Sequence, residues 1–306
     1  MSQIRDIYSI TRKRIILIIL FFNVFIRCFS QMINNEKANI LTEEPFFNSS
    51  FVRSASLKSI VGTISTKKEL GVIKSSGRKI SYMFNKNGKL ACRYTTNYRK
   101  DSNFIFYEYN FDNLMVKRHS DSYGFYSYSY EYNDNGYQKN QVYSREKNAS
   151  KGKINFTLKE KLVVFKEFYK YSVSDTVVVK TCLNSNGRPY QEVIFYYDKL
   201  GYLKESSTRL LINNEFQKEV YNYNERGLLK SVDFFKGNIE SPYKGVKYSY
   251  DELGNVTFID EYKNQERVVH KELLYNPSNF ILKTILSQDL VTNLITITKF
   301  KPKFYN

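Results

Sequence analysis

Apolar and polar residues alternate along most of the chain after residue 31, which is the period-two pattern of a β-strand with one apolar face. Val246, Tyr248 and Tyr250, for example, are separated from one another by single polar residues. A turn signal follows at once, because Asp251 can cap a turn through its side chain and Gly254 can take the positive φ of a tight hairpin. Alternation then resumes, so this unit predicts a β-hairpin.

The hairpin pattern recurs along the chain with a spacing of mostly about 23 to 27 residues, which is in the range of repeat arrays. The turn residues that mark its copies are Gly88, Asn113, Gly136, Gly187, Gly201, Gly227, Asp251, Gly254 and Asn279. In two copies an asparagine stands where the others have glycine, and asparagine also tolerates a left-handed backbone. Gly187 lies about half a repeat before Gly201. One half-unit is therefore expected to have a strong turn where the others have a weak connector.

These turns, with weaker turn signals between them, predict an antiparallel meander of roughly 16 to 18 short strands. The chain holds 27 Tyr and 23 Phe, residues that favour strands, and no long stretch after residue 31 has a helical period. We therefore expect an all-β fold, an antiparallel β-hairpin repeat array. Because a sheet with one apolar face must cover it, the array should curl into a spiral sheet or an open barrel. A sandwich of two meandering sheets is the alternative.

A tyrosine stripe marks the apolar face of one predicted strand. Tyr126, Tyr128, Tyr130 and Tyr132 fall on one side of that strand, while serine and glutamate fall on the other. Together with Tyr248 and Tyr250 they form a candidate aromatic face. One interpretation of this face is a packed core. The other is a partly exposed platform for sugars or a protein partner, and tyrosine suits both because it has an apolar ring and a polar tip.

The segment from Gly245 to Val256 resembles the YD repeat of Rhs and teneurin-like proteins, and residues 196–203 and 221–229 resemble it more weakly. The resemblance implies a hairpin array that curls into a spiral sheet or shell in a surface or secreted setting. In large family members the shell encloses a toxic C-terminal domain or acts as a cell-surface scaffold. This chain is shorter, so we expect neither a closed shell nor an enclosed domain. MORN-like repeats, which are also Tyr- and Gly-rich hairpins, are the rival resemblance.

The first 30 residues have the features of a secretory signal peptide. Four basic residues precede an apolar run over residues 15–26, which is too short to cross about 30 Å of hydrocarbon. Small residues then predict cleavage between Ser30 and Gln31. A signal anchor and lipidation of Cys28 are the alternatives. We expect a flexible lead-in over residues 31–56, a repeat domain over 57–306, and a secreted, periplasmic or cell-surface protein that does not span the membrane after cleavage.

The chain is strongly basic, with a formal net charge of +17 that falls to about +13 when residues 1–30 are removed. A positive field attracts polyanions, and after export an acidic polysaccharide or a protein of the cell envelope is the expected partner rather than nucleic acid. The basic residues are spread along the chain, so solvated strand faces also account for them. We expect Cys92 on the aromatic side and Cys182 on the opposite side, with no disulfide between them.

The sequence contains no recognisable catalytic motif. Its two histidines, His119 and His270, lie in different repeats, and no nucleophile elbow, Walker loop or metal-ligand spacing is present. We therefore predict no enzymatic activity, no cofactor and no metal. Two carboxylates that meet across strands could still form a glycosidase site, which one sequence cannot reveal.

The expected function is that of a secreted, non-catalytic β-repeat protein that binds or scaffolds at the bacterial cell envelope. One alternative is a partner or immunity-type protein of a polymorphic toxin system, which rests on the Rhs resemblance alone. Another is an outer-membrane β-barrel. Such a barrel needs strands of about 9 to 11 residues with an uninterrupted apolar band, whereas lysine and glutamate often interrupt these strands.

Overall fold

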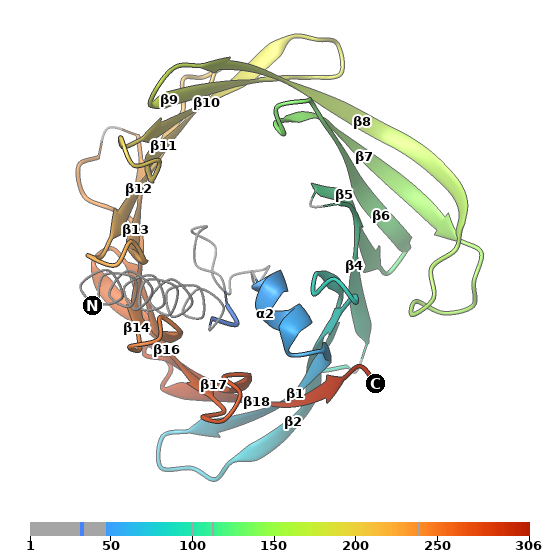
Figure 1. The fold of residues 1–306 in the computed structure, drawn as a ribbon, viewed down its shortest axis with the longest axis vertical. Helices are drawn as coiled ribbons and strands as arrows, with labels where there is room; N and C mark the ends of the chain where they lie inside the picture. The colour runs from blue at the N-terminus through green and yellow to red at the C-terminus, as the bar shows by residue number, and fades with distance from the viewer. Residues whose placement is uncertain (1–30, 34–46, 100, 112, 238) are drawn as a thin grey trace, which may run out of the picture.

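The computed structural model describes residues 31–33, 47–99, 101–111, 113–237 and 239–306, and these form a closed antiparallel β-barrel of 18 strands (Figure 1). The strands are β1 (Leu57–Lys68), β2 (Lys74–Phe84), β3 (Leu90–Thr96), β4 (Ser102–Asn110), β5 (Asn113–Asp121), β6 (Gly124–Tyr132), β7 (Gln138–Asn148), β8 (Leu158–Val173), β9 (Val177–Leu183), β10 (Pro189–Tyr197), β11 (Leu203–Leu210), β12 (Phe216–Tyr223), β13 (Leu229–Lys236), β14 (Lys244–Tyr250), β15 (Val256–Lys263), β16 (Glu266–Tyr275), β17 (Leu282–Asp289) and β18 (Leu294–Phe304). One short helix, α2 (Ser49–Ser54), precedes them. The prediction of an all-β antiparallel array is confirmed.

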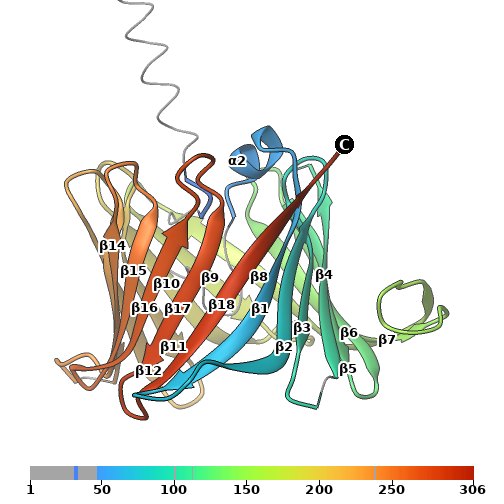
Figure 2. The same cartoon turned by 90° about the horizontal axis from the view of Figure 1, so that it is seen from below.

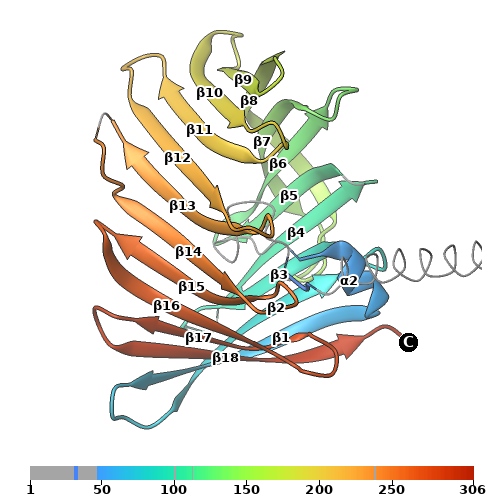
Figure 3. The same ribbon diagram turned by 60° about the vertical axis from the view of Figure 1, so that its left-hand side comes forward.

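The barrel closes, which corrects the expectation of a spiral sheet or an open barrel. The first and last strands pair antiparallel along their whole length, from Leu57 opposite Phe304 to Lys68 opposite Leu294. Every other strand pairs with its two neighbours in the sequence, and Figure 3 shows the strands running obliquely across the wall. Closure satisfies the backbone groups that would stay unpaired at two sheet edges.

Turns join the strands at two rims (Figure 2). We call the end that holds α2 the plug rim and the opposite end the distal rim. In the repeated turns an Asn or Asp side chain accepts hydrogen bonds from the backbone two and four residues further on. Asn133 Oδ1, for example, accepts from Asn135 N at 3.1 Å and Tyr137 N at 2.9 Å. Most of the motif turns lie at the plug rim: they hold Gly88, Gly136, Gly201, Gly227, Asp251 and Gly254.

Gly187 lies in the turn between β9 and β10, at the distal rim. Its turn therefore replaces a weak connector of the other repeats, which explains its irregular spacing in the sequence. The expectation for the two asparagine copies needs correction. Asn113 is the first residue of β5 and pairs with Asn110, and the positive φ falls on Phe111 instead. In the last plug-rim turn the positive φ likewise falls on Phe280, while Asn279 accepts a hydrogen bond from Ile281 N.

The described parts of the predicted flexible lead-in are folded into the barrel, which is a second correction. Met32 and Ile33 are fully buried, and α2 buries Phe51 and Val52. Asn48 caps this helix by accepting hydrogen bonds from the N–H groups of its first turn. The physical reason is that the lumen at the plug rim is apolar, so these side chains leave water by entering it. We call residues 31–33 and 47–56 the plug; Figure 1 shows α2 inside the ring.

A recurrent tyrosine contact ties neighbouring repeats together at the plug rim. A tyrosine at or near the end of one strand donates a hydroxyl hydrogen bond to the carbonyl of a residue at or near the start of the preceding strand. These bonds join Tyr109 to Leu90, Tyr132 to Leu114, Tyr223 to Leu203, Tyr250 to Leu229 and Tyr275 to Val256, at 2.5 to 3.0 Å. The bonds give a physical reason for the tyrosine that precedes each Asn or Asp turn of the repeat.

The plug identifies which wall face is lumenal. Phe47 of the plug contacts Tyr82 of β2, with ring centroids 5.1 Å apart, so Tyr82 points inward. Residues opposite each other in neighbouring antiparallel strands share a face. The row that contains Tyr82 is therefore lumenal, and it continues through Arg93, Ile105, His119, Tyr126 and Arg145. Along each strand, the residues that alternate with this row point outward. The predicted signal peptide and its cleavage site lie outside the described residues.

Candidate functional site

The predicted aromatic face points into the barrel and divides into two parts. Near the plug, Tyr248 is buried in the core cluster, and Tyr250 packs against that cluster. On β6, Tyr126, Tyr128 and Tyr130 are only half-buried. A β-bulge between Glu131 and Tyr132 lets the Tyr132 hydroxyl reach the backbone of β5. The sequence left open a core or a platform, and the structure contains both, at different depths of the lumen.

The half-buried tyrosines belong to a continuous set of rings on β5 to β8, in the half of the lumen near the distal rim. We call His119, Tyr126, Tyr128, Tyr143 and Phe165 the lumenal aromatic wall. His119 stacks on Tyr126 with ring centroids 4.8 Å apart and planes 5° from parallel. Tyr143 lies 5.3 Å from Tyr128 and 6.0 Å from Phe165. Such partly exposed rings present flat apolar faces with hydroxyl groups at their edges.

Cationic side chains border this wall. Arg93 lies in the same lumenal row as His119, and Lys117 is directly opposite Tyr128. The guanidinium of Arg145 lies over the Tyr126 ring, 5.8 Å from its centroid, and Arg145 forms an ion pair with Asp121. A cavity of about 390 Å³ is lined by Arg93, Ile105, His119, Asp121 and Tyr126, among others. The local charge is therefore positive, with one carboxylate against three cations.

The pKa of His119 is lowered by burial and by this positive field. Burial, together with the charges of Lys117 and Arg93, lowers its pKa from 6.5 to about 4. The imidazole is therefore neutral at pH 7. Its Nε2 atom is buried and has no hydrogen-bond partner within the described part of the chain. A neutral ring stacked on Tyr126 extends the aromatic wall without adding to its charge.

The lowered pKa of His119 predicts a pH dependence of stability. Between about pH 6.5 and 4 the unfolded chain binds a proton at His119 that the folded chain does not bind, so stability falls as the pH falls. We expect the wild type to lose about 1 to 2 kcal/mol more than His119→Gln between about pH 7.5 and 4.5, after allowance for solvent screening. Urea unfolding at both pH values measures this difference. Equal losses in the two proteins would contradict it.

The outer face of the wall is polar. Charged side chains point outward from most strands: Lys67, Glu108, Arg118, Glu131, Glu146, Lys166, Glu192, Glu205, Lys218, Asp233, Lys247, Asp260, Glu272 and Lys299. Several pair across strands, such as Arg209 with Glu192 at 3.1 Å. A lipid-facing wall instead carries an apolar band about 25 Å tall. The charge pattern of this outer face is that of a surface in contact with water.

A buried ion-pair network also lies on the outer face. Arg118 donates to Glu146 through Nε at 2.5 Å and also pairs with Glu108, and Ser127 donates to the other Glu146 oxygen at 2.7 Å. The loop between β7 and β8 covers this network, since Phe156 lies over the Arg118 guanidinium at 3.9 Å. The covered charges hold that loop against the wall.

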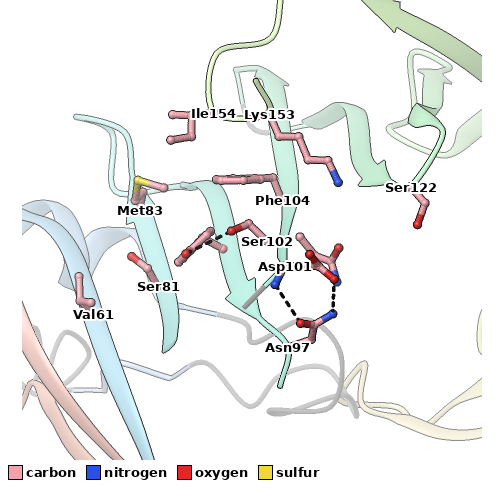
Figure 4. A pocket seen from close by; sticks show the side chains of 12 residues that line it. Val61, Ser81, Met83, Asn97, Asp101, Ser102, Phe104, Ser122, Lys153 and Ile154 are labelled. Atoms are coloured by element: carbon pink, nitrogen blue, oxygen red, sulfur yellow. Dashed lines mark hydrogen bonds between the residues drawn. The ribbon is translucent and has the colours of Figure 1, made fainter. Parts of the chain in front are cut away.

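A second cavity, of about 1030 Å³, lies on the outer face beneath the same loop. Val61, Met83 and Phe104 form its floor, and Lys153 and Ile154 overhang it (Figure 4). The turn polar groups beside it bond to one another. Asn97 accepts from the backbone of Asp101 at 2.9 Å, and Ser102 donates to Tyr94 at 3.4 Å. The lining of the cavity thus mixes apolar and polar side chains. Because Asn97 and Ser102 already bond within their own hairpin, the cavity is a weaker candidate than the lumen.

The two cysteines lie on the faces opposite to those expected. Cys92 is in register with Met83 and Phe106, which point outward, whereas Cys182 is opposite Tyr169 in the lumen. The error has a clear cause: a bulge beside the turn shifts the register between Met83 and Phe84. Both thiols are free and buried, and burial raises the pKa of Cys92 to about 12.

The histidines do not meet. His119 is lumenal, while His270 points outward and contacts Asp260 through Nδ1 at 2.7 Å. Among the described residues, no group of three or more His, Cys, Asp or Glu side chains is placed to hold a metal ion. Within the same ranges, the structure contains no helix with the length and apolarity to cross a bilayer. The prediction that the chain is not an enzyme stays a prediction.

Sequence reasoning missed most of the residues that surround the tyrosine stripe. Arg93, Lys117, Tyr143, Arg145 and Phe165 come from four other strands and meet the stripe only through the register of the sheet. An alignment of hairpin arms about the turn between β6 and β7 would have placed Ser144, rather than Arg145, opposite Tyr126, because the bulge between Glu131 and Tyr132 shifts the register by one residue.

No protein-family model matches the chain, and no curated protein is similar to it. Among solved structures, a porin-like protein from Bacteroides uniformis aligns with 81% of this chain and 98% of its own, with 12% identity and a TM-score of 0.37. A porin-like protein from Bacteroides vulgatus has the same coverage, 10% identity and a TM-score of 0.32. The Photorhabdus luminescens Tc holotoxin pore matches 74% of this chain and 14% of that chain, with 12% identity and a TM-score of 0.30. Such low scores carry no inference about what this chain binds.

Proposed function

We propose that this chain is an exported, non-catalytic binding protein of the cell envelope whose lumen takes an acidic carbohydrate. The observation that carries the proposal is the lumenal aromatic wall with its cationic border. Half-exposed Tyr126, Tyr128 and Tyr143 present ring faces, and Arg145 lies beside them. Sugar rings stack on aromatic faces, and the guanidinium and ammonium groups attract carboxylates or sulfates of the polymer.

The polar outer face and the positive net charge support a water-facing protein that meets anionic polymers after export. Arg145 is exposed at the lumenal surface although it pairs with Asp121, so a ligand carboxylate can approach it without leaving a buried charge unpaired. A neutral His119 at pH 7 leaves the ring surface free of the strong hydration that an imidazolium would carry. These features fit stacking recognition rather than chemistry on the ligand.

Binding of polygalacturonate fragments, with a neutral glucan as comparison, tests the proposal by calorimetry. We expect the acidic fragments to bind and to weaken as salt rises, because screening acts on exposed charges. Tyr126→Ala should lower the affinity about tenfold, which is the expected loss of one ring contact. Tyr196→Ala is the matched control, because Tyr196 points outward from β10.

Equal binding of the neutral glucan would show that the cationic side chains do not contribute to binding. An equal loss of affinity in Tyr126→Ala and Tyr196→Ala would show that the lumenal aromatic wall is not the binding site. Thermal unfolding of both variants establishes that neither loss follows from a change in folding.

An outer-membrane β-barrel is the second candidate function, and closure of the sheet favours it. The barrel has an even number of antiparallel strands, as bacterial outer-membrane barrels do. The charged outer face counts against it, since a lysine or arginine at the bilayer midplane costs about 2 to 4 kcal/mol.

Alkaline carbonate extraction of the envelope of expressing cells separates the two candidates. A barrel that spans the bilayer stays in the membrane pellet. The binding protein proposed above is released into the supernatant.

A further inference from the structure

The tips of the distal rim carry large apolar side chains that are exposed to solvent. They occur in six separate turns: Leu70, Val72, Ile73, Tyr98, Tyr123, Ile212, Ile239 and Val291. Tyr123 is 92% exposed, Ile212 88% and Val291 77%. None of these side chains lies in the lumenal core cluster. A single exposed apolar side chain is ordinary on a protein surface, so the informative feature is the number of such side chains gathered at one rim.

The plug rim differs from the distal rim. Among the described residues, its exposed apolar tips are Phe111, Leu200, Tyr202 and Leu253. Other apolar residues of the plug-rim turns point inward, such as Ile281, which is buried in the core cluster. The two ends of one barrel thus have different surfaces, although the same repeat builds both.

Basic residues stand beside the apolar tips of the distal rim. Lys67, Lys68 and Lys74 flank the turn of Leu70, and Arg99 is next to Tyr98. Lys68, Lys74 and Arg99 are exposed. Several carboxylates of this rim already have partners: Asp289 accepts from the backbone of its own turn, and Asp121 pairs with Arg145. Among the described residues, exposed carboxylates also stand at this rim, at Glu69, Asp101, Glu215, Glu240 and Glu266, but they are outnumbered by the exposed basic residues Lys68, Lys74, Arg99, Lys151, Arg188, Lys236 and Lys263. The balance of exposed charge at the rim is therefore positive.

We propose that the distal rim docks on the surface of an anionic lipid bilayer, with the apolar tips inserted among the headgroups and the lysines beside them. A bilayer fits the pattern because each tip is a single side chain on its own turn, spread around a ring with polar residues between. A protein partner instead requires a contiguous central cluster of anchors. A lipid surface accepts separate tips, and binding scales with inserted apolar area and with attraction between basic residues and anionic headgroups.

Figure 2 shows turns of the distal rim together at one end of the barrel, opposite α2. Docking there would set the barrel axis perpendicular to the membrane surface, with the plug rim pointing away from the membrane. The polar outer wall then stays in water. This arrangement does not depend on the carbohydrate proposed for the lumen.

Tryptophan fluorescence tests the proposal, because the chain has no natural Trp. Single reporters are placed in the full chain at the distal rim (Val291→Trp), at the plug rim (Leu200→Trp) and on the outer wall (Phe258→Trp, which points outward). Each protein is mixed with vesicles of phosphatidylcholine and phosphatidylglycerol in a ratio of about 7:3, and with phosphatidylcholine alone. Brominated lipids report insertion by quenching.

We expect a blue shift and quenching for Val291→Trp alone, and a stronger response with the anionic vesicles. Quenching of Phe258→Trp as well would mean that the barrel spans the bilayer, and it would overturn the docking proposal. A response of Leu200→Trp that equals or exceeds that of Val291→Trp would place the membrane at the other end and overturn it too. No response from any reporter would also overturn it.

A second variant checks that the natural tips drive the binding. Replacement of Leu70, Val72 and Ile73 by serine should lower vesicle partitioning about tenfold or more, because three exposed side chains lose their apolar area. The same replacement of Phe111 and Leu200 at the plug rim should leave partitioning unchanged. Since all five side chains are solvent-exposed, neither variant removes a core contact, and a fall in the plug-rim variant alone would contradict the proposal.

Discussion

Gly88→Ala is expected to destabilise the barrel by about 2 to 4 kcal/mol more than Gly136→Ala does. Both glycines occupy the same position of a plug-rim turn, with φ of 80° and 78°, so both variants bear the cost of an alanine in a left-handed conformation. They differ in their surroundings. A Cβ at Gly88 would overlap the carbonyl oxygen of Ser49 and lie 2.8 Å from the amide nitrogen of Arg53, whereas a Cβ at Gly136 would meet nothing within 4 Å.

The difference between the two variants isolates the contact between the turn and the plug. Since the clashing atoms belong to the backbone of α2, no side-chain rotation relieves the overlap, and the helix must move out of the lumen. Urea unfolding followed by tyrosine fluorescence measures the two stabilities, and trypsin cleavage after Arg53 reports release of the helix. Equal stabilities and equal cleavage rates would show that α2 does not occupy this position in solution.

The strands and turns of this barrel could be predicted from the sequence because their causes are local. Alternation of apolar and polar residues sets which face of a strand is buried, and the Asn or Asp that accepts two backbone hydrogen bonds sets where the strand ends. The irregular spacing of Gly187 predicted a strong turn where the other repeats have a weak connector, and the structure places that turn at the distal rim. The outcome was a correct fold class with an incorrect degree of closure.

Closure could not be predicted because it depends on a pairing between the two ends of the array. Leu57 and Phe304 are adjacent in the sheet but lie at opposite ends of the sequence. A strand with one apolar face has the same pattern in an open spiral and in a closed barrel. The plug was missed for a similar reason. Met32 and Phe51 lie in a segment with many polar residues and no regular apolar pattern. Their burial becomes favourable only because the lumen of the closed barrel has an apolar lining.

The lumenal site was half predicted. The tyrosines of β6 stand two residues apart, so their common face is a local property. Their neighbours depend on register, and each bulge next to a turn shifts that register by one residue and exchanges the two faces. Cys92 shows the consequence, because it follows Leu90 by two residues yet points outward while Leu90 is in the lumenal core. Faces can be inferred along a regular stretch of strand but not across the bulge that stands beside a turn.

Glu146→Ala should cost about 3 to 5 kcal/mol of stability, although Glu146 lies on the outer face of the wall. Its side chain is 1% exposed, and that of its partner Arg118 is 8% exposed. Removal of the carboxylate leaves a buried guanidinium with only Glu108, whose side chain is 55% exposed, and also removes the acceptor of the Ser127 hydroxyl. A charge that has lost its buried partner is far more costly than a charge in water.

Glu160→Ala is the matched control, because Glu160 also forms an ion pair between β7 and β8 but in water. Its contact with Lys147 is 2.6 Å, yet the two side chains are 56% and 72% exposed, so we expect a much smaller loss of stability than for Glu146→Ala. Urea unfolding of both variants at low and high salt measures the contrast, and salt should reduce only the smaller effect. Similar costs for the two variants would mean that water reaches Arg118. The loop that carries Phe156 would then not cover the wall, and the charges beneath it would not hold it in place.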